Sequence, residues 1–165
     1  KKMKKHIQPV SDILAWCLMP NHFHFMVYTT EQSVLLINEK HRERTQQLSK
    51  NIGTLLSSYT QAFNKQYHLK GSLWAHNTEA IILNDIQDAY ACTCFHYIHQ
   101  NPVKAYLAAK MEDWEFSSYL DYTGERKGAL INKELAYALL DIDKAHFKEQ
   151  SEIILDEKLI KHIFA

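Results

Sequence analysis

The stretch that decides the fold is ILAWCLMPNHFHFMVY, residues 13–28. Its first part, Ile13–Leu18, is a short apolar run rich in strand-forming residues, and Met19-Pro20-Asn21 interrupts that run with turn-forming residues. A second run, from about His22 to Tyr28, alternates in period two, so every second side chain shares a face. The pattern predicts a β-hairpin over residues 12–28.

The second strand of this hairpin places two imidazoles, His22 and His24, on one face. Such a pair is the simplest way for a sheet to offer two ligands to a metal ion. Ten histidines in 165 residues produce roughly 0.6 pairs of this spacing by chance, so the pair needs support from elsewhere. The alternative is two polar side chains on a solvent-facing strand.

Further along the chain, apolar spacing and capping residues predict several more elements. An amphipathic helix is expected over about 44–64, a strand over 79–83 and a helix over 86–100 that Pro102 stops. The aromatic and serine cluster of 114–119 is expected in a loop. Asn132 and Asp141 are predicted to cap helices over 133–140 and 142–155, before an apolar tail over 159–164.

The helix over 86–100 supplies a second set of reactive side chains, because Tyr97 and Asn101 lie four residues apart and share a helix face. If this face packs over the histidine pair, Asn101 would complete a metal site and Tyr97 would point at a bound phosphate. A tyrosine with a pKa of about 10 is a poor nucleophile unless a metal neutralises the phosphate. The structural alternative is a Tyr97 buried in the core.

Composition and charge limit the class of protein. A chain of 165 residues with 46% hydrophobic content fits one domain with a small appendage, and no apolar run is long enough to cross a membrane, so the expected compartment is the cytoplasm. Cys17, Cys92 and Cys94 have neither disulfide nor zinc spacing and are expected to be buried. The formal net charge is zero, but residues 1–110 hold 12 basic against 7 acidic residues, which favours contact with phosphates.

Two motifs together resemble one family. LMPNHFH at 18–24 and YIHQNPVK at 97–104 are similar to the paired motifs of REP-associated tyrosine transposases, within the single-tyrosine HUH (IS200-like) transposases. GSLW at 71–74 and WEFSSY at 114–119 match two further family segments, so the resemblance covers about residues 12–124. The chain differs from the family at Asn77 and Thr78, where members usually carry arginine and phenylalanine.

The resemblance implies a metal-dependent enzyme acting on single-stranded or hairpin DNA. His22, His24 and Asn101 would bind Mg²⁺ or Mn²⁺, and Tyr97 would form a 5′-phosphotyrosine link. Monomer and homodimer both stay open, and no membrane partner is expected. Candidate DNA contacts, from charge and position, are Lys40, Arg42, Arg44, Lys50, His76, His99 and Lys104.

The implied fold is α+β, an α/β sandwich of ferredoxin-like HUH type in which helices pack on a central antiparallel sheet. The transposase domain would span 1–124, followed by a helical C-terminal extension over 125–165. The basic opening segment, Lys1–Lys5, looks like the end of a helix, so the first strand of the family's sheet is expected upstream. Two alternatives remain: a domesticated DNA-binding module without cleavage, and a metal-dependent phosphodiester hydrolase that uses water.

Overall fold

The computed structural model describes residues 1–39, 42–74, 78–83, 89–153 and 155. They form two compact units that each draw on two parts of the chain. Unit 1 consists of Lys1–Asp12 and Tyr28–Ala80, and unit 2 consists of Ile13–Val27 and Ile81–Ala165. The described helices and strands confirm the mixed α and β character that the sequence predicts.

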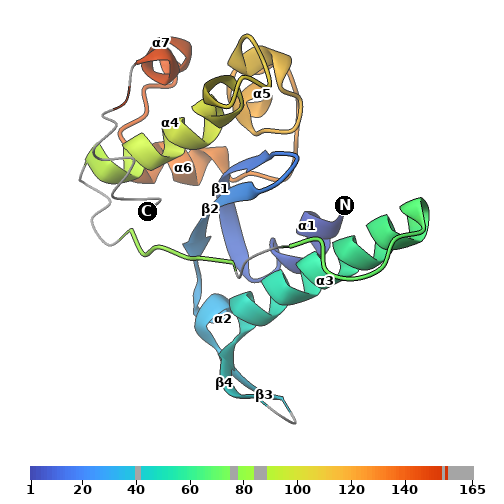
Figure 1. Ribbon diagram of the computed structural model, residues 1–165. Helices are drawn as coiled ribbons and strands as arrows, with labels where there is room; N and C mark the ends of the chain where they lie inside the picture. The colour runs from blue at the N-terminus through green and yellow to red at the C-terminus, as the bar shows by residue number, and fades with distance from the viewer. Residues whose placement is uncertain (40–41, 75–77, 84–88, 154, 156–165) are drawn as a thin grey trace. The chain divides into compact units, whose positions relative to one another are not determined.

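The elements follow the chain as Figure 1 shows. The paired strands of the opening hairpin are β1 (Ser11–Leu18) and β2 (Phe23–Thr29). Unit 1 adds α1 (Lys2–His6), α2 (Glu31–Val34), β3 (Leu36–Glu39), β4 (Arg42–Gln46) and α3 (Gln47–Tyr67). Unit 2 adds α4 (Ala89–Lys104), the 3-10 helix η1 (Met111–Asp113), α5 (Tyr119–Tyr122), α6 (Lys133–Leu139) and α7 (Phe147–Glu152).

The predicted hairpin is confirmed, with its strands one or two residues longer or later than expected. The outer edge of β1 is not left bare, because backbone groups of residues 116–118 bond to it. The amide of Leu18 donates to the carbonyl of Phe116 at 2.8 Å, and that of Ser118 donates to the carbonyl of Trp16 at 2.8 Å. The aromatic and serine cluster therefore acts as the predicted loop, although Tyr119 already begins α5.

Unit 1 is organised around the long helix α3, against which α1 and α2 pack. The side chain of Asn51 donates to the carbonyl of His6 at 2.8 Å, and Lys2 Nζ donates to the carbonyl of Ser58 at 3.0 Å. The helix begins three residues later than predicted, because β4 occupies the segment before Gln47. It ends at His68, whose left-handed backbone (φ 55°) lets the amide of Leu69 cap the carbonyl of Asn64.

The small β3–β4 hairpin was not predicted. Its strands pair Leu36 with Gln46, Ile37 with Thr45 and Glu39 with Arg42. The second strand is polar throughout, so it lacks the alternation that would have indicated a strand. Backbone pairing between neighbouring segments is sufficient to form it.

Unit 2 has a continuous apolar core beneath α4. The core combines hairpin side chains such as Leu14, Cys17 and Met26 with Cys94, Phe95 and Ile98 of α4. The core also includes residues of the C-terminal extension: Ala136, Leu140, Ile142 and Phe147. The predicted boundary near residue 124 stays a prediction, but these side chains share one core with the segment before it.

Two predictions about this region are wrong. Residues 78–83 form no strand: Ile81 and Ile82 are 50% and 81% exposed, and β-branched residues favour a strand only where a partner strand packs beside them. Pro102 does not stop α4, which continues to Lys104. The pyrrolidine ring is fully buried, and this packing offsets the one amide hydrogen bond that proline removes.

The C-terminal helices agree with the sequence in part. Asn132 caps α6 by accepting from the amide of Leu135 at 3.1 Å, as predicted. The helix expected from Ile142 begins only at Phe147, because Ile142 itself is buried and Asp143 binds the backbone of a bend at Ala145. The predicted tail over 159–164 lies outside the described residues. Within the described part of the chain, no helix is both long and apolar enough to cross a membrane.

Candidate active site

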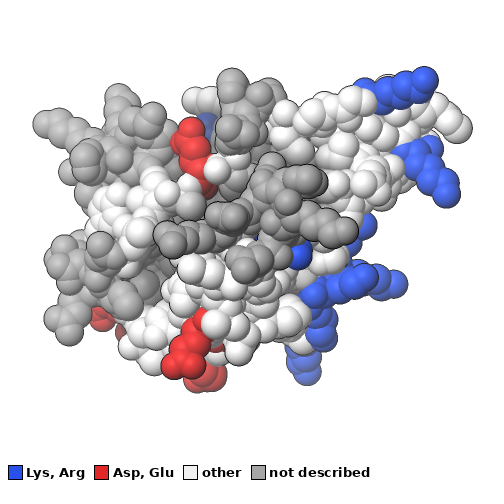
Figure 2. Space-filling model, turned by 90° about the horizontal axis from the view of Figure 1, so that it is seen from below, with Lys and Arg blue, Asp and Glu red and all other residues white. Residues whose placement is uncertain are grey.

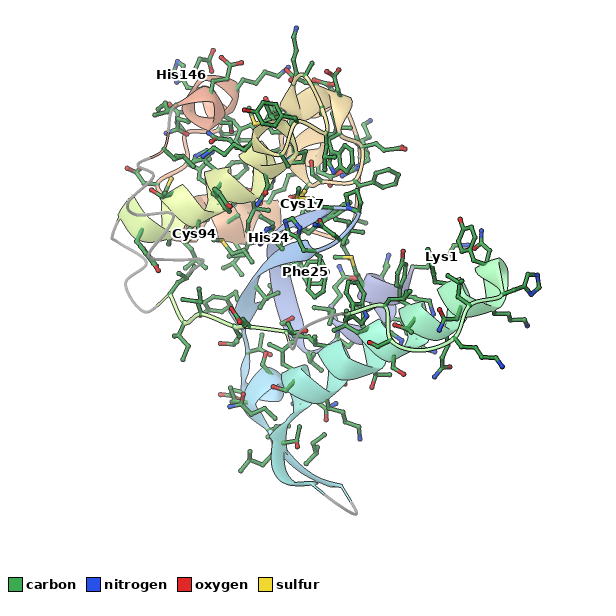
Figure 3. All side chains as sticks on the ribbon, viewed as in Figure 1. Lys1, Cys17, His24, Phe25, Cys94 and His146 are labelled. Atoms are coloured by element: carbon green, nitrogen blue, oxygen red, sulfur yellow. The ribbon has the colours of Figure 1, made fainter. Side chains whose placement is uncertain are left out.

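The β1–β2 turn positions the two histidines. The amide of Met19 donates to the carbonyl of His22 at 2.9 Å and closes the turn, so β2 starts one residue after His22. The two imidazole rings lie on the same face, with centroids 5.0 Å apart and planes at 83°. Phe23 and Phe25 occupy the other face, with centroids 4.8 Å apart, and Figure 3 labels His24 and Phe25 on this strand. The predicted alternation is therefore confirmed.

The spacing of the two rings fits a shared cation. With a metal–nitrogen bond of about 2.1 Å, a ring centroid lies about 3.2 Å from the metal, and two such rings at 90–110° lie about 4.5–5.2 Å apart. The observed 5.0 Å falls within that interval. His22 Nδ1 donates to Asn21 Oδ1 at 2.7 Å, which orients this ring and leaves Nε2 as its lone-pair nitrogen.

The chemistry of His24 also suits a metal ligand. Burial, together with the nearby His22, lowers the pKa of His24 from 6.5 to about 4. The ring is therefore neutral at pH 7 and retains a lone pair that can bind a cation. Two imidazole nitrogens alone favour ions such as Zn²⁺, whereas Mg²⁺ and Mn²⁺ prefer oxygen ligands, which the amide of Asn101 and a phosphate would add.

Helix α4 brings Tyr97 to the histidine pair, within unit 2. The Tyr97 ring centroid lies 6.0 Å from that of His24, with the planes at 74°. Tyr97 is half-buried, in contrast to the core position considered as the alternative, while its neighbours Phe95, His96 and Ile98 are buried. The face of α4 that carries Tyr97 thus meets the hairpin, which was the condition attached to the predicted site.

Asn101 lies one helical turn after Tyr97 and interacts with it. Burial raises the pKa of Tyr97, and a hydrogen bond from the Asn101 side chain lowers it in part. Asn101 is 6% exposed, so its amide works in a water-poor setting. Its predicted role as third metal ligand stays a prediction. Within the described residues no three His, Cys, Asp or Glu side chains gather for a metal, and an amide ligand lies outside that set.

Lys104 is the predicted DNA contact that the structure brings to Tyr97. Its Nζ lies 5.2 Å from the centroid of the Tyr97 ring, and the side chain is exposed. This arrangement holds a positive charge beside the hydroxyl-bearing ring.

The other predicted DNA contacts lie elsewhere. His99 is 1% exposed and its Nε2 bonds Ser118 Oγ at 2.7 Å, while burial lowers its pKa to about 3, so it is a core residue that offers DNA no surface. Lys50 is exposed on α3 in unit 1. Arg42 and Arg44 have described backbones in β4, whereas their side chains, Lys40 and His76 lie outside the described residues.

Sequence reasoning missed two supporting residues. Asn21 orients His22, and its place in the Pro-Asn turn next to the histidine was the available signal. Ser118 joins three parts of unit 2, because its Oγ accepts from the amide of Trp16 at 2.9 Å and also bonds His99. A serine in a loop gives no sequence signal for this.

Comparison of the chain with protein-family models, curated proteins and solved structures finds no match in any of the three. The arrangement of His22, His24, Tyr97, Asn101 and Lys104 is therefore the observation on which a function rests.

Proposed function

We propose that this protein is a DNA transposase-type nuclease, which cleaves and rejoins single-stranded or hairpin DNA through a metal-assisted 5′-phosphotyrosine intermediate. The supporting observation is the meeting of two motifs far apart in sequence: the Tyr97 ring lies 6.0 Å from that of His24, which itself lies 5.0 Å from His22. A half-buried tyrosine next to the neutral imidazole of His24 suits nucleophilic attack on a phosphate.

Each residue has a distinct task in this proposal. His22 and His24 would hold Mg²⁺ or Mn²⁺, with Asn101 as third ligand. When bound, the metal would polarise the scissile phosphate and offset the charge that develops on it. Burial raises the pKa of the Tyr97 hydroxyl, and the neighbouring Asn101 side chain opposes part of that rise. Lys104 would pair with a phosphate oxygen.

The proposed step conserves the phosphodiester bond energy. The Tyr97 oxygen attacks the phosphorus, the bond to the 3′ oxygen breaks, and the proton lost by tyrosine is balanced by the one gained at the leaving 3′-hydroxyl. The reverse attack by a 3′-hydroxyl on the phosphotyrosine rejoins a strand and restores the tyrosine. Neither the cleavage step nor the rejoining step consumes water or a nucleoside triphosphate.

The resemblance to single-tyrosine HUH transposases supports the same proposal. LMPNHFH and YIHQNPVK are the two segments that converge at the site. Within the proposal, the fold is the ferredoxin-like HUH type, with a transposase domain over 1–124 and a helical extension over 125–165.

The test incubates the whole protein with a 5′-labelled and a 3′-labelled hairpin oligonucleotide, each with a single-stranded flank, in Mn²⁺ on a denaturing gel. A covalent adduct is expected on the fragment that carries the 5′-phosphate. Tyr97→Phe should reduce adduct formation by at least about 10³-fold, because phenylalanine has no nucleophilic oxygen. Tyr106→Phe is the matched control, since Tyr106 is 96% exposed just beyond α4 and its loss should leave the adduct unchanged.

The metal ligands are tested by a second readout. His24→Ala should weaken Mn²⁺ binding at least tenfold in calorimetric titration, independently of any cleavage. Cleavage that persists in Tyr97→Phe would replace this proposal with a water-using hydrolase. DNA binding by wild type and Tyr97→Phe, with cleavage by neither, would favour a domesticated DNA-binding module.

A further inference from the structure

Unit 1 has a partly exposed row of aromatic rings that the proposed chemistry does not use. Tyr67, Phe63 and Tyr59 follow one another at four-residue spacing along α3, with ring centroids 4.5 Å and 6.1 Å apart. Trp74 extends the row, because its ring centroid lies 6.0 Å from that of Tyr59. We call these four residues the aromatic ladder.

The ladder depends on the end of α3. The left-handed His68 reverses the chain, and Asn64 Nδ2 donates to the carbonyl of Gly71 at 2.8 Å, which holds the returning segment against the helix. Trp74 can therefore meet Tyr59, two helical turns before Tyr67.

The ladder faces solvent more than a core stripe would. Tyr59 and Tyr67 are 46% and 55% exposed, Phe63 and Trp74 are partly buried, and Leu55 is the buried residue of α3. Spacing alone predicts that one apolar stripe of α3, through Phe63, is buried. Only its first part, at Leu55, is buried, and from Tyr59 onward the stripe is accessible to solvent. A row of accessible rings is a surface on which unpaired bases can stack.

The charge of unit 1 favours a polyanion at this surface. Its two chain segments contain ten lysines and arginines against five acidic residues, whereas unit 2 contains nine against fourteen. Lys70 is exposed in the segment that follows the ladder helix, and Lys2 donates to the carbonyl of Ser58, the residue before Tyr59. Lys65 is also exposed, but it lies on the opposite face of α3 from Phe63 and Tyr67. Figure 2 shows blue side chains where α3 lies and few red ones there.

We infer that the aromatic ladder binds unpaired single-stranded DNA, with bases stacked on the rings and phosphates attracted by the surplus positive charge of unit 1, which includes Lys70 in the segment that returns along α3. The inference rests on the proposed function for the identity of the nucleic acid, since it assigns a binding surface for the unpaired flank of the same substrate. Tyr97 is not part of the ladder surface, so a failure of strand binding can be distinguished from a failure of strand cleavage.

The test measures fluorescence anisotropy of a labelled oligothymidine and of a duplex of equal length with the whole protein. The single strand should bind more tightly than the duplex. Tyr67→Ala and Tyr59→Ala should each weaken binding about five- to a hundredfold, the usual range for one base–aromatic stack. Tyr28→Ala, which removes a 40% exposed ring of β2 outside the ladder, is the matched control and should bind as the wild type does.

Three further results decide the inference. Tyr97→Phe should bind oligothymidine unchanged, even if the proposed cleavage is never observed. Equal affinity for duplex and single strand, or full binding by Tyr67→Ala with unchanged circular dichroism, would overturn the ladder as a base-stacking surface. A dimer in sedimentation that Tyr67→Ala dissociates would also overturn it, because a second copy of the chain would then cover the rings.

Discussion

At the residue scale, position 128 has room only for glycine, because the ion pair of Asp121 with Arg126 lies against it. A Cβ at this position would lie 2.3 Å from Asp121 Oδ1, and Asp121 is 1% exposed. The carboxylate cannot move aside, because Arg126 Nε and Nη2 bond its two oxygens at 2.8 and 2.7 Å. Gly128→Ala should lower the free energy of unfolding by about 2 kcal/mol or more, measured by urea denaturation.

Gly53 is the matched control for this prediction. It lies in the interior of α3, and an added Cβ would meet nothing within 4 Å. Gly53→Ala should therefore raise the free energy of unfolding by about 0.5–1 kcal/mol, through lower backbone entropy of the unfolded chain. Equal effects of the two substitutions would show that the contact with Asp121 is unimportant.

A second residue-scale prediction concerns acid stability. Burial lowers the pKa of His96 from 6.5 to about 4, and its Nδ1 lies 3.1 Å from Ser151 Oγ. Because the unfolded chain takes up this proton first, the stabilisation is fully present above pH 6.5 and is lost as the pH falls towards 4. The loss is on the order of 3 kcal/mol for this group. Urea midpoints at several pH values should fall less steeply for His96→Leu than for wild type, and parallel curves would contradict the assignment.

At the element scale, α6 depends on its cap. Asn132 Oδ1 accepts from the amide of Leu135, one of the unpaired donors at a helix start. Asn132→Ala should lower the free energy of unfolding by about 1 kcal/mol, whereas Asn132→Asp should keep the cap and lose less. Thermal unfolding followed by circular dichroism would test this, and equal losses in both variants would show that the cap contributes little.

Helix α7 belongs to the core rather than to a loose tail. Phe147 is 3% exposed, and its ring centroid lies 5.2 Å from that of Tyr122 and 6.2 Å from that of Phe95. Gln100 Nε2 also donates to the carbonyls of Ser151 and Ile153 at 2.8 and 2.9 Å. Phe147→Ala should lower the free energy of unfolding by about 3–5 kcal/mol. The exposed Phe116→Ala is a control that should lose much less.

The sequence predicts those elements whose pattern is local. The hairpin around His22 follows from alternation and a Pro-Asn turn, and the cap at Asn132 follows from one side chain and its neighbours. The segment around Ile82 shows the limit, because strand-forming residues need a partner strand that local sequence does not reveal. Pro102 shows another, since its cost to α4 is offset by burial among residues distant in sequence.

In the candidate site, too, the local arrangements were predictable and the long-range packing was not. Alternation places His22 beside His24, and helical spacing places Tyr97 beside Asn101. Their meeting was expected only if α4 packed on the hairpin, which depends on the shared core of unit 2. The prediction that His99 contacts DNA was wrong because His99 belongs to a run of buried residues, 98–102, in α4. The sequence did not show that this part of the helix would be covered by the segment that carries Ser118.

At the scale of the whole molecule, the zero net charge conceals a basic and an acidic unit. Binding of single-stranded DNA should follow the basic unit, and each phosphate contact should add about 0.7 to the slope of log affinity against log salt. Replacing exposed Lys70 with glutamine should therefore lower that slope by about 0.7. Lys144→Gln in unit 2 is the charge-matched control and should leave the slope unchanged.

The chain passes between the two units three times, after Asp12, Val27 and Ala80. The hairpin with His22 and His24 is consequently encoded between the two segments that make the basic unit. Any gene rearrangement that moved the basic unit as one fragment would take the histidines along and leave Tyr97 behind. Under the proposed function, strand recognition and strand chemistry must be inherited together, so a lineage could acquire a new target by point substitution but not by exchanging modules.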